Sequence, residues 1–335
     1  MADSSYSAIN RFRLTEPANH ALYILSSYLK RLLLLYKNFA LHRRVYETTD
    51  KEGMPLSRIV YIGNLENLDW LEDSMLAGAK LRDNRKLSLM ECRAEVRNWS
   101  GSAIVVMDHN RFLTPFLPSG GHTTYPWVRQ VISLDSNEYK SRRSNIMSEF
   151  RRVMRQQGYS TELTSNSKDV EFFYEKLYSP FVHYRFGNAA HLRSLSELLK
   201  AARRGFLIQV FFKDSWIAGD IFRVCGNEIQ VLASGLLPDY QQASRRKTRT
   251  VIYPILFEWA SVKGYRRINL LRSRPNLKDG VFASKAHRGA TAELDSWPHS
   301  ALQIYVPENL ELPGMWKSQL VRRNGKLIPL EDVLA

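Results

Sequence analysis

The stretch FLIQVFFKDSWIAGDIFRVCGNEIQVLASGLL, residues 206–237, contains three apolar runs separated by two short polar reversals. The reversals fall at Asp214-Ser215 and Gly226-Asn227, residue types that tolerate a change of chain direction. Runs of this length joined by such short connections are typical of consecutive antiparallel strands. The stretch therefore predicts a three-stranded antiparallel meander.

The residues before the meander have helical rather than strand-like spacing. Residues 170–178, VEFFYEKLY, predict a helix that we expect Pro180 to break. Residues 192–204 predict a second helix, which Gly205 is expected to close in a left-handed cap. Two helices followed by a meander indicate a domain that mixes both kinds of element.

After the meander comes a basic run and then a further helix and strand. We expect SRRKTRT, residues 244–250, to form a loop, and VIYPILFEWASVKG, residues 251–264, to form an apolar-striped helix. Pro254 is expected in the first turn of that helix, because a proline inside a helix costs about 3 kcal/mol. The strand RRINLL, residues 266–271, is expected to follow that helix.

The strand leads into SRPNLKDGVFASKAHRG, residues 273–289, which we interpret as a loop. Asp279-Gly280 is expected to form a turn, and three cationic or titratable side chains follow it: Lys285, His287 and Arg288. These charges either solvate a surface loop or line a site that handles an anion.

The first half of the chain alternates strand-like runs with charged, helical segments. The runs are 57–63, 101–107 and 128–134. A helix capped by Asp135 or Ser136 and ended by Gly158 should follow the last of them. The polar segment 160–169 has no apolar period, so we place a boundary there and expect two domains, residues 1–160 and 161–335. The predicted fold class is α/β with mixed sheets.

Composition limits the partners and the compartment. The 335 residues contain 48 Lys and Arg against 33 Asp and Glu, a net charge of +15, which favours anionic partners. Cys92 and Cys225 have no cysteine or histidine cluster near them in sequence, so we expect neither a disulfide framework nor a metal site. A reducing cytoplasm is the compartment that fits this cysteine content best. Residues 22–39 have helical apolar spacing, but their longest apolar run is far below the roughly twenty residues of a transmembrane helix. We expect a buried helix there, with peripheral membrane contact as the alternative.

The order of these elements resembles the acyl-transfer domain of the GNAT superfamily, and more closely its Fem-type branch, which resembles two such domains in tandem. Three stretches carry the resemblance: VISLDSNEYKSRRSNIMSEFRRVMRQQG, FFYEKLYSPFVHYRFG and RINLLRSRPNLKDGVFASKAHRGA. They cover residues 128–290, whereas residues 1–120 match in general character only. The resemblance implies a degenerate first domain on the acceptor side and a second domain that transfers an acyl group from an activated donor to an amine. It also implies that the second domain has a mixed sheet in which strand 267–272 runs beside strand 228–236.

GNAT enzymes bind the donor's pyrophosphate with a glycine-rich loop, and this chain departs from that pattern. The corresponding stretch, YQQASRRKTRT, has no glycine, so the long side chains of Arg245, Arg246, Lys247 and Arg249 would have to reach the donor's phosphates. The donor is then acyl-coenzyme A or, as in several Fem-type relatives, aminoacyl-tRNA. We favour the thioester, because the basic runs are scattered and no aromatic stacking platform accompanies them.

The resemblance also implies residue roles. Lys285 lies where Fem-type domains carry a lysine near the reacting carbonyl, and we expect it to stabilise the oxyanion. Arg185 and Arg274 are expected to orient an anionic small-molecule, nucleotide-linked or lipid-linked amine acceptor, and Asp279 with Gly280 to shape the loop. Each residue also has a plain structural interpretation as a surface charge or turn, and His183 as a structural histidine.

A second function class remains open. Five arginines of the helix after Leu134 could track phosphates, although an α-helix spreads them over more than one face: Arg142, Arg143, Arg151, Arg152 and Arg155. The alternative is therefore a non-catalytic protein that keeps the fold and binds RNA or an anionic surface.

Overall fold

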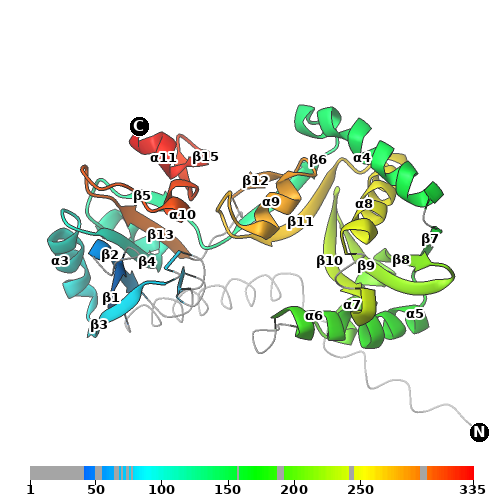
Figure 1. Cartoon of the computed structure of the whole chain (residues 1–335), viewed down its shortest axis with the longest axis horizontal. Helices are drawn as coiled ribbons and strands as arrows, with labels where there is room; N and C mark the ends of the chain where they lie inside the picture. Colours follow the sequence, from blue (N-terminus) through cyan, green and yellow to red (C-terminus); the bar gives the residue numbers. More distant parts are fainter. Residues whose placement is uncertain are drawn as a thin grey trace, which may run out of the picture. The chain divides into compact units, whose positions relative to one another are not determined.

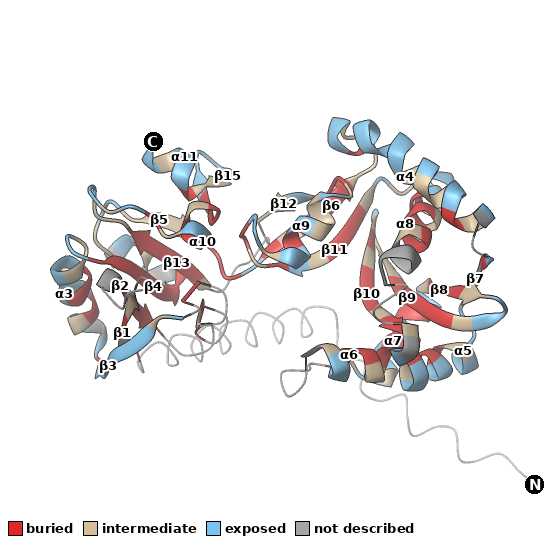
Figure 2. Cartoon of the chain, in the orientation of Figure 1, coloured by how far each residue is buried: buried red, intermediate tan, exposed pale blue. Residues whose placement is uncertain are grey.

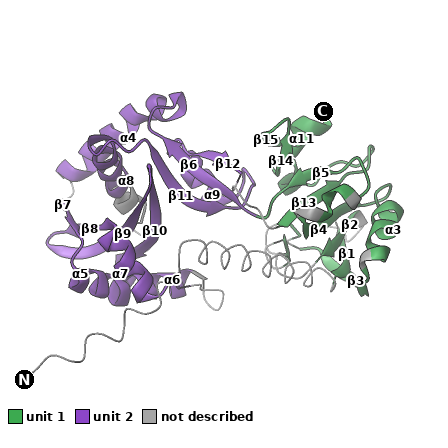
Figure 3. Cartoon of the chain, turned by 180° about the vertical axis from the view of Figure 1, so that it is seen from behind, with its two compact units in different colours: residues 1–126, 297–335 green, residues 127–296 purple. Residues whose placement is uncertain are grey.

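The chain forms two compact units, each of which includes one large sheet (Figures 1 and 3). Unit 1 contains residues 1–126 and 297–335, and unit 2 contains residues 127–296. The computed structural model describes residues 41–49, 55–63, 68, 71–72, 75–76, 78–156, 158–186, 192–240, 245–294 and 300–335. The helix expected within residues 22–39 lies outside the described residues.

The sheet of unit 1 has the strand order β3-β1-β2-β4-β13-β5. Its strands are β1 (Leu41–Thr49), β2 (Pro55–Gly63), β3 (Lys80–Leu87), β4 (Ile104–Asn110), β5 (His122–Thr124) and β13 (Ser300–Tyr305). The pair β2 and β4 is parallel, and the other neighbours are antiparallel. The remaining elements of this unit are α3 (Leu89–Trp99), η2 (Arg111–Phe116), α10 (Gly314–Lys317), β14 (Leu320–Arg323), β15 (Lys326–Pro329) and α11 (Leu330–Leu334).

The sheet of unit 2 has the order β12-β6-β11-β10-β9-β8-β7. Its strands are β6 (Val128–Ser133), β7 (Tyr159–Thr164), β8 (Gly205–Phe212), β9 (Ser215–Cys225), β10 (Glu228–Leu236), β11 (Arg267–Ser273) and β12 (Thr291–Glu293). The meander β8-β9-β10 is antiparallel, and β11 runs parallel beside β10. Both predictions are confirmed, and with them the mixed α/β fold class.

The two sheets repeat one arrangement. Each has a run of antiparallel strands, three in unit 1 and four in unit 2, whose last strand pairs in parallel with the next; two further antiparallel strands follow. In unit 1 the parallel pair is β2 with β4, and in unit 2 it is β10 with β11. This repetition is consistent with two domains of one fold in tandem.

Helices cover both faces of the unit 2 sheet, and the core lies between the layers (Figure 2). On one face Trp259 of α8 packs against Phe206 of β8, with ring centroids 4.2 Å apart. On the other, Phe173 lies close to Gly219 of β9. The helices of this unit are α4 (Asn137–Gln156), α5 (Ser167–Phe172), η3 (Phe173–Tyr178), α6 (Ser179–Phe186), α7 (Leu195–Arg203), η5 (Pro238–Tyr240), α8 (Arg245–Val262) and α9 (Gly280–Ala286).

The division into units differs from the boundary expected near residue 160. β6 pairs with β11 and β12, which places residues 127–160 in unit 2. β13 pairs with β4 and β5, which returns the end of the chain to unit 1. Sequence composition marks flexible connections, whereas long-range strand pairing decides these units.

Two helix boundaries also differ from expectation. Gly205 is the first residue of β8 and is not among the described glycines with a positive φ. A glycine is needed here for a steric reason instead, because a Cβ at this position would lie 2.1 Å from the carbonyl oxygen of Phe222. Pro180 does not break the helix: the preceding turn η3 is π-helical, with Ser179 N–H donating to Tyr174 O, and α6 continues through the proline. The wider π turn accommodates the residue that lacks an N–H.

Residues 245–250 of the basic run are helical rather than a loop, which overturns a further expectation. α8 begins at Arg245, so Pro254 lies inside the helix instead of in its first turn. Buried apolar side chains on the same helix, including Val251, Ile252 and Leu256, pack against the sheet. This packing outweighs the local cost of the proline.

The helix expected after Leu134 is confirmed. Ser136 Oγ accepts a hydrogen bond from Tyr139 N at 3.1 Å, and Gly158 has the left-handed φ of 63° expected of a residue that follows a helix. None of the helices in the described part of the chain is long and apolar enough to cross a bilayer.

Candidate active site

The two parallel strands of unit 2 separate after a short paired segment, and a pocket lies where they diverge. β10 and β11 pair only over residues 228–230 and 267–269, and then run apart (Figure 1). A pocket of about 650 Å³ is lined by the diverging parts of both strands, residues 231–234 and 270–272, together with side chains of α6, α7, α8 and α9. The divergence exposes backbone groups of two strands to one cavity.

Both strands have a register irregularity where they diverge, β10 in its pairing with β9 and β11 at a bulge in its pairing with β6. The pairing of β11 with β6 shifts register between Asn269 and Arg272, and Leu271 in the shift has a φ of 62°. This left-handed conformation costs a non-glycine residue roughly 1 kcal/mol or more. Asn269 stabilises it, since its Oδ1 accepts a hydrogen bond from Leu271 N at 2.8 Å. Strain held in place by a buried side chain is typical of functional sites.

Lys285 lies against this bulge. Its Nζ atom donates to the carbonyl oxygen of Arg272 at 2.9 Å and to Ser273 Oγ at 3.0 Å, with the carbonyl of Leu271 at 3.5 Å. Lys285 also lines the pocket. The bulge thus turns carbonyl oxygens toward the ammonium group and fixes it at the wall of the cavity.

The segment that carries Lys285 is a short helix, not the loop expected from the sequence. Asp279 caps α9, with its Oδ1 accepting a hydrogen bond from Phe282 N at 2.7 Å, and Gly280 is the first helical residue. An aspartate followed by glycine is compatible with either a turn or a helix N-cap, and seven helical residues are too few for an apolar period to decide. Asp279 therefore positions α9 and, through it, Lys285.

Positive charge dominates the lining of the pocket. Arg185, Arg193, Arg272 and Lys285 all contribute to it. Glu197 is the one carboxylate among the described lining residues, and it accepts a hydrogen bond from Ser194 N in the capping box of α7. A cavity lined in this way attracts an anionic ligand.

The predicted acceptor residues lie in different places. Arg185 lines the pocket, as an acceptor-binding residue would. Arg274 is not among the lining residues; its guanidinium stacks on Trp127 at 3.5 Å from the ring centroid. Burial lowers the pKa of Arg274 to about 10, and the Asp279 carboxylate opposes that shift. His183 is exposed on α6, with Nδ1 2.8 Å from the carbonyl oxygen of Ser179, consistent with its structural interpretation.

The predicted donor-binding residues occupy the start of α8. The backbone of Arg245, Arg246, Lys247 and Arg249 belongs to its first turns. The first N–H groups of an α-helix have no partner within the helix, so this position favours anions even without a glycine-rich loop. The side chains of these four residues lie outside the described part of the structure.

Sequence reasoning missed Gln130 and did not use Ser273. Gln130 is fully buried in β6, and Ser273 is 1% exposed at the end of β11. Gln130 Oε1 accepts a hydrogen bond from Ser273 Oγ at 2.6 Å. The available signal was that Gln130 alternates with Val128 and Ile132 on one face of the strand VRQVIS, because a buried amide requires partners.

The parallel pair of unit 1 stays closed at the corresponding place. β2 and β4 pair over residues 59–62 and 104–107, and Tyr61 then donates a hydrogen bond to Asp108 Oδ2 at 2.9 Å. A Cβ at Gly63 would lie 2.6 Å from the Cβ of Asp108, so the two strands are in close contact there. The described parts of β2 and β4 therefore do not separate at this point as β10 and β11 do.

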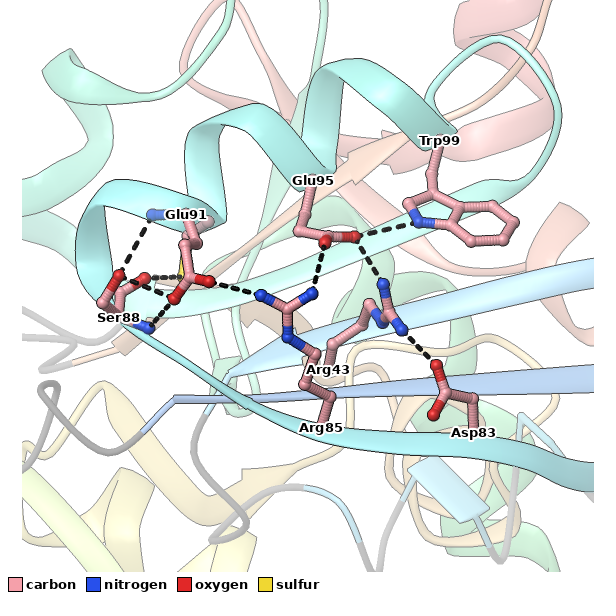
Figure 4. Close-up of polar contacts among 8 residues, drawn as sticks. Arg43, Asp83, Arg85, Ser88, Glu91, Glu95 and Trp99 are labelled. Atoms are coloured by element: carbon pink, nitrogen blue, oxygen red, sulfur yellow. Dashed lines mark hydrogen bonds and ion pairs between the residues drawn. The ribbon is translucent and has the colours of Figure 1, made fainter.

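Arginines of unit 1 are neutralised within a network between β1, β3 and α3 (Figure 4). Arg43 pairs with Asp83 and Glu95, Arg85 pairs with Glu91, and Trp99 Nε1 donates to Glu95 at 3.0 Å. The α4 helix of unit 2 differs: among the described residues, no carboxylate pairs with its exposed cations Lys140, Arg143, Arg151 and Arg152. These four side chains of α4 thus keep their positive charge without a carboxylate partner in the described part of the chain.

Comparisons with known proteins describe fold only. No protein-family model and no curated protein matches the sequence. The solved structure of FemX is similar at 10% identity, with 78% of this chain and 83% of that chain covered and a TM-score of 0.41. The structure of L-PGS from Bacillus licheniformis gives 10% identity, 78% and 83% coverage and a TM-score of 0.40.

A PaiA N-acetyltransferase from Thermoplasma acidophilum, solved in complex with coenzyme A, gives 14% identity, 44% and 99% coverage and a TM-score of 0.30. Fem-type and GNAT proteins are therefore among the structures that this chain resembles, as its sequence led us to expect. Because the sequence identities and TM-scores are this low, neither the residue roles nor the substrates of those proteins can be assigned to this chain. Among the residues that the structure describes, no three His, Cys, Asp or Glu side chains gather as metal ligands would.

Proposed function

We propose that the chain is an N-acyltransferase that moves an acyl or aminoacyl group from an activated donor to an amine in the pocket of unit 2. One observation carries the proposal: Lys285 is fixed as a hydrogen-bond donor at the wall of a cationic cavity that opens between two diverging parallel strands. The donor is a coenzyme A thioester or an aminoacyl-tRNA, and we favour the thioester.

The proposed step is direct. The amine nitrogen attacks the donor's carbonyl carbon, a C–N bond forms, and the carbonyl oxygen becomes an oxyanion. Lys285 donates a hydrogen bond to that oxygen, and a donor fixed before the reaction stabilises the transition state without reorganisation. The C–S or C–O bond of the donor then breaks, its electron pair leaves with the thiolate or alkoxide, and the proton lost by the amine neutralises that leaving group.

The positions of the cationic residues suggest where the acceptor and the donor would each bind. Arg185 would orient an anionic group of the acceptor, because it lines the pocket that holds Lys285. The start of α8, with Arg245, Arg246, Lys247 and Arg249, would bind the donor's phosphates. Unit 1 would serve the acceptor side. The free cysteines Cys92 and Cys225 fit a reducing compartment, so a cytoplasmic location belongs to the proposal.

A second candidate is a non-catalytic protein that binds RNA or another anionic surface. The exposed cations of α4 favour it. The two candidates differ in what happens to a bound donor, since only a transferase consumes it.

The test is product formation. Purified protein is incubated with acetyl-coenzyme A and, separately, with aminoacyl-tRNA, each with a panel of anionic amines, and amide products are detected by mass spectrometry. Small molecules that co-purify with the protein guide the choice of amines. The proposal predicts an amide product that needs both donor and amine and is lost in Lys285→Ala. Binding of RNA without any amide product from either donor would favour the second candidate.

A further inference from the structure

The hydrogen bonds behind Lys285 have a single direction. Gln130 Nε2 donates to the carbonyl oxygen of Phe282 at 3.0 Å, and this contact orients the amide, because the opposite orientation would face two oxygens together. Gln130 Oε1 therefore points toward Ser273 and accepts its hydroxyl proton at 2.6 Å. A hydroxyl has one proton, so Ser273 Oγ is left to accept from Lys285 Nζ at 3.0 Å.

This chain of contacts joins three elements around one ammonium group. Gln130 comes from β6, Ser273 ends β11, and Lys285 belongs to the last turn of α9. Both polar side chains behind the lysine are buried, at 0% and 1% exposure. Buried polar groups are costly unless every partner is present, and here each bond fixes the direction of the next.

The arrangement favours one form of the lysine. The carbonyl oxygen of Arg272 accepts only, and Ser273 Oγ has its proton committed to Gln130. Neither atom can donate to the lone pair of a neutral amine, whereas both accept from an ammonium. The surroundings thus hold Lys285 as a donor rather than as a nucleophile or base.

We infer that Gln130 and Ser273 are positioning residues: they form a one-way hydrogen-bond relay that holds the Lys285 ammonium as a donor toward the pocket. The catalytic meaning of the relay rests on the proposed function, but the relay itself does not. It predicts that Lys285 is a poor nucleophile in the folded protein and becomes more reactive when the relay is broken.

The test uses the full chain and no substrate. Native protein is trace-labelled with acetic anhydride at fixed pH, and mass spectrometry compares acetylation of Lys285 with that of Lys263, an exposed lysine of the same unit. Ser273→Ala should raise the Lys285 to Lys263 ratio by about fivefold, the scale of one lost hydrogen bond. Ser273→Thr keeps the hydroxyl and should restore the original ratio. Ser160→Ala makes the same chemical change at an exposed position of β7 and should leave the ratio unchanged.

Gln130→Met, which is close in volume to the native residue, keeps the test decisive if Ser273→Ala fails to fold. It should also raise the ratio, and the double variant should exceed Ser273→Ala by little, because Gln130 acts through Ser273. An unchanged ratio in folded Ser273→Ala or Gln130→Met, or additive effects in the double variant, would overturn the relay. Loss of transferase activity plays no part in this readout. A protein with the relay intact but no amide product would contradict the proposed function alone.

Discussion

The Nζ atom of Lys285 lies 2.9 Å from the carbonyl oxygen of Arg272, which the bulge in β11 presents to it. The side chain of Asn269 spans the bulge: it accepts a hydrogen bond from Leu271 N and donates one to Glu228 Oε1, both at 2.8 Å. The strained backbone at Leu271, the buried amide of Asn269 and the ammonium group of Lys285 thus belong to one hydrogen-bonded cluster.

Replacing Asn269 should destabilise the bulge in β11. Asn269→Ala removes one hydrogen bond of the Glu228 carboxylate and leaves Leu271 N without the partner that supports its left-handed conformation, so the free energy of unfolding should fall by about 1–3 kcal/mol. Urea unfolding measures the loss. Asn145→Ala, at an exposed position of α4, is the control and should change stability by less than about 0.5 kcal/mol. Equal stability of the two variants would show that the bulge needs no support from Asn269.

Two glycines of unit 2 should respond in opposite ways to the same substitution. Gly205→Ala places a Cβ 2.1 Å from the carbonyl oxygen of Phe222, so it should cost about 1–3 kcal/mol. Gly280 begins α9 with nothing within 4 Å of its Cβ position, and Gly280→Ala should be neutral or stabilise by up to about 1 kcal/mol. Urea midpoints compare them. A large loss of stability in Gly280→Ala would show that the backbone at this position requires a glycine.

Unit 1 should lose stability in mild acid because of His109. Burial lowers the pKa of this histidine, so in the folded state it resists the proton that the unfolded chain binds near its ordinary value of about 6.5. Above that pH the His109 imidazole is neutral in both the folded and the unfolded state, so it does not reduce the free energy of unfolding. As pH falls below about 6.5 the unfolded state binds more protons, and the free energy of unfolding falls by up to about 1.4 kcal/mol per pH unit.

Urea unfolding at several pH values between about 7.5 and 5 checks this in wild type and His109→Gln. The variant should show a flatter dependence. A slope equal to that of the wild type would mean that another group accounts for the acid sensitivity.

Salt dependence should separate the two donors. A coenzyme A thioester engages few phosphates, so its affinity should fall gently with salt. RNA held along α4 engages many, and the logarithm of affinity should then fall by about 0.7–0.9 per phosphate for each unit of log salt. We expect Arg245→Ala/Arg246→Ala to weaken acetyl-coenzyme A binding and Arg151→Ala/Arg152→Ala to leave it unchanged.

Arg58→Ala/Arg82→Ala removes two exposed cations that pair with Glu47 in unit 1 and serves as the charge-matched control. Titrations at several salt concentrations give the slopes. Steep RNA binding that depends on Arg151 and Arg152, with no coenzyme A binding, would reverse our choice of donor.

Local pattern in the sequence was enough to predict the meander, the helix α4 and the strand β11, whereas the position of β11 beside β10 was predicted from the family resemblance. Each of these three elements depends on apolar period and turn residues within one short segment. Local pattern was not enough to predict that β13 returns to unit 1, because Ile304 pairs with Val106 across nearly two hundred residues. Nor could it predict that α8 begins at Arg245, since packing against the sheet overrides Pro254.

The candidate site shows the same limit. Lys285 and Arg185 could be named from their place in recognisable stretches, and the structure brings both to one pocket. Arg274 could be named in the same way, yet it stacks on Trp127. Gln130 and the bulge at Leu271 depend on contacts between strands distant in sequence, which no single segment encodes.

The central claim is that Lys285 stabilises the oxyanion of an acyl-transfer reaction, and turnover of Lys285→Ala tests it most directly. Amide formation is measured with a donor and amine that the wild type accepts, beside Lys278→Ala, an exposed lysine of the same segment, as the control. The account predicts that Lys285→Ala folds with unchanged donor affinity and loses kcat by about a hundredfold or more, the scale of removing one fixed donor. Wild-type kcat in the folded variant would contradict it.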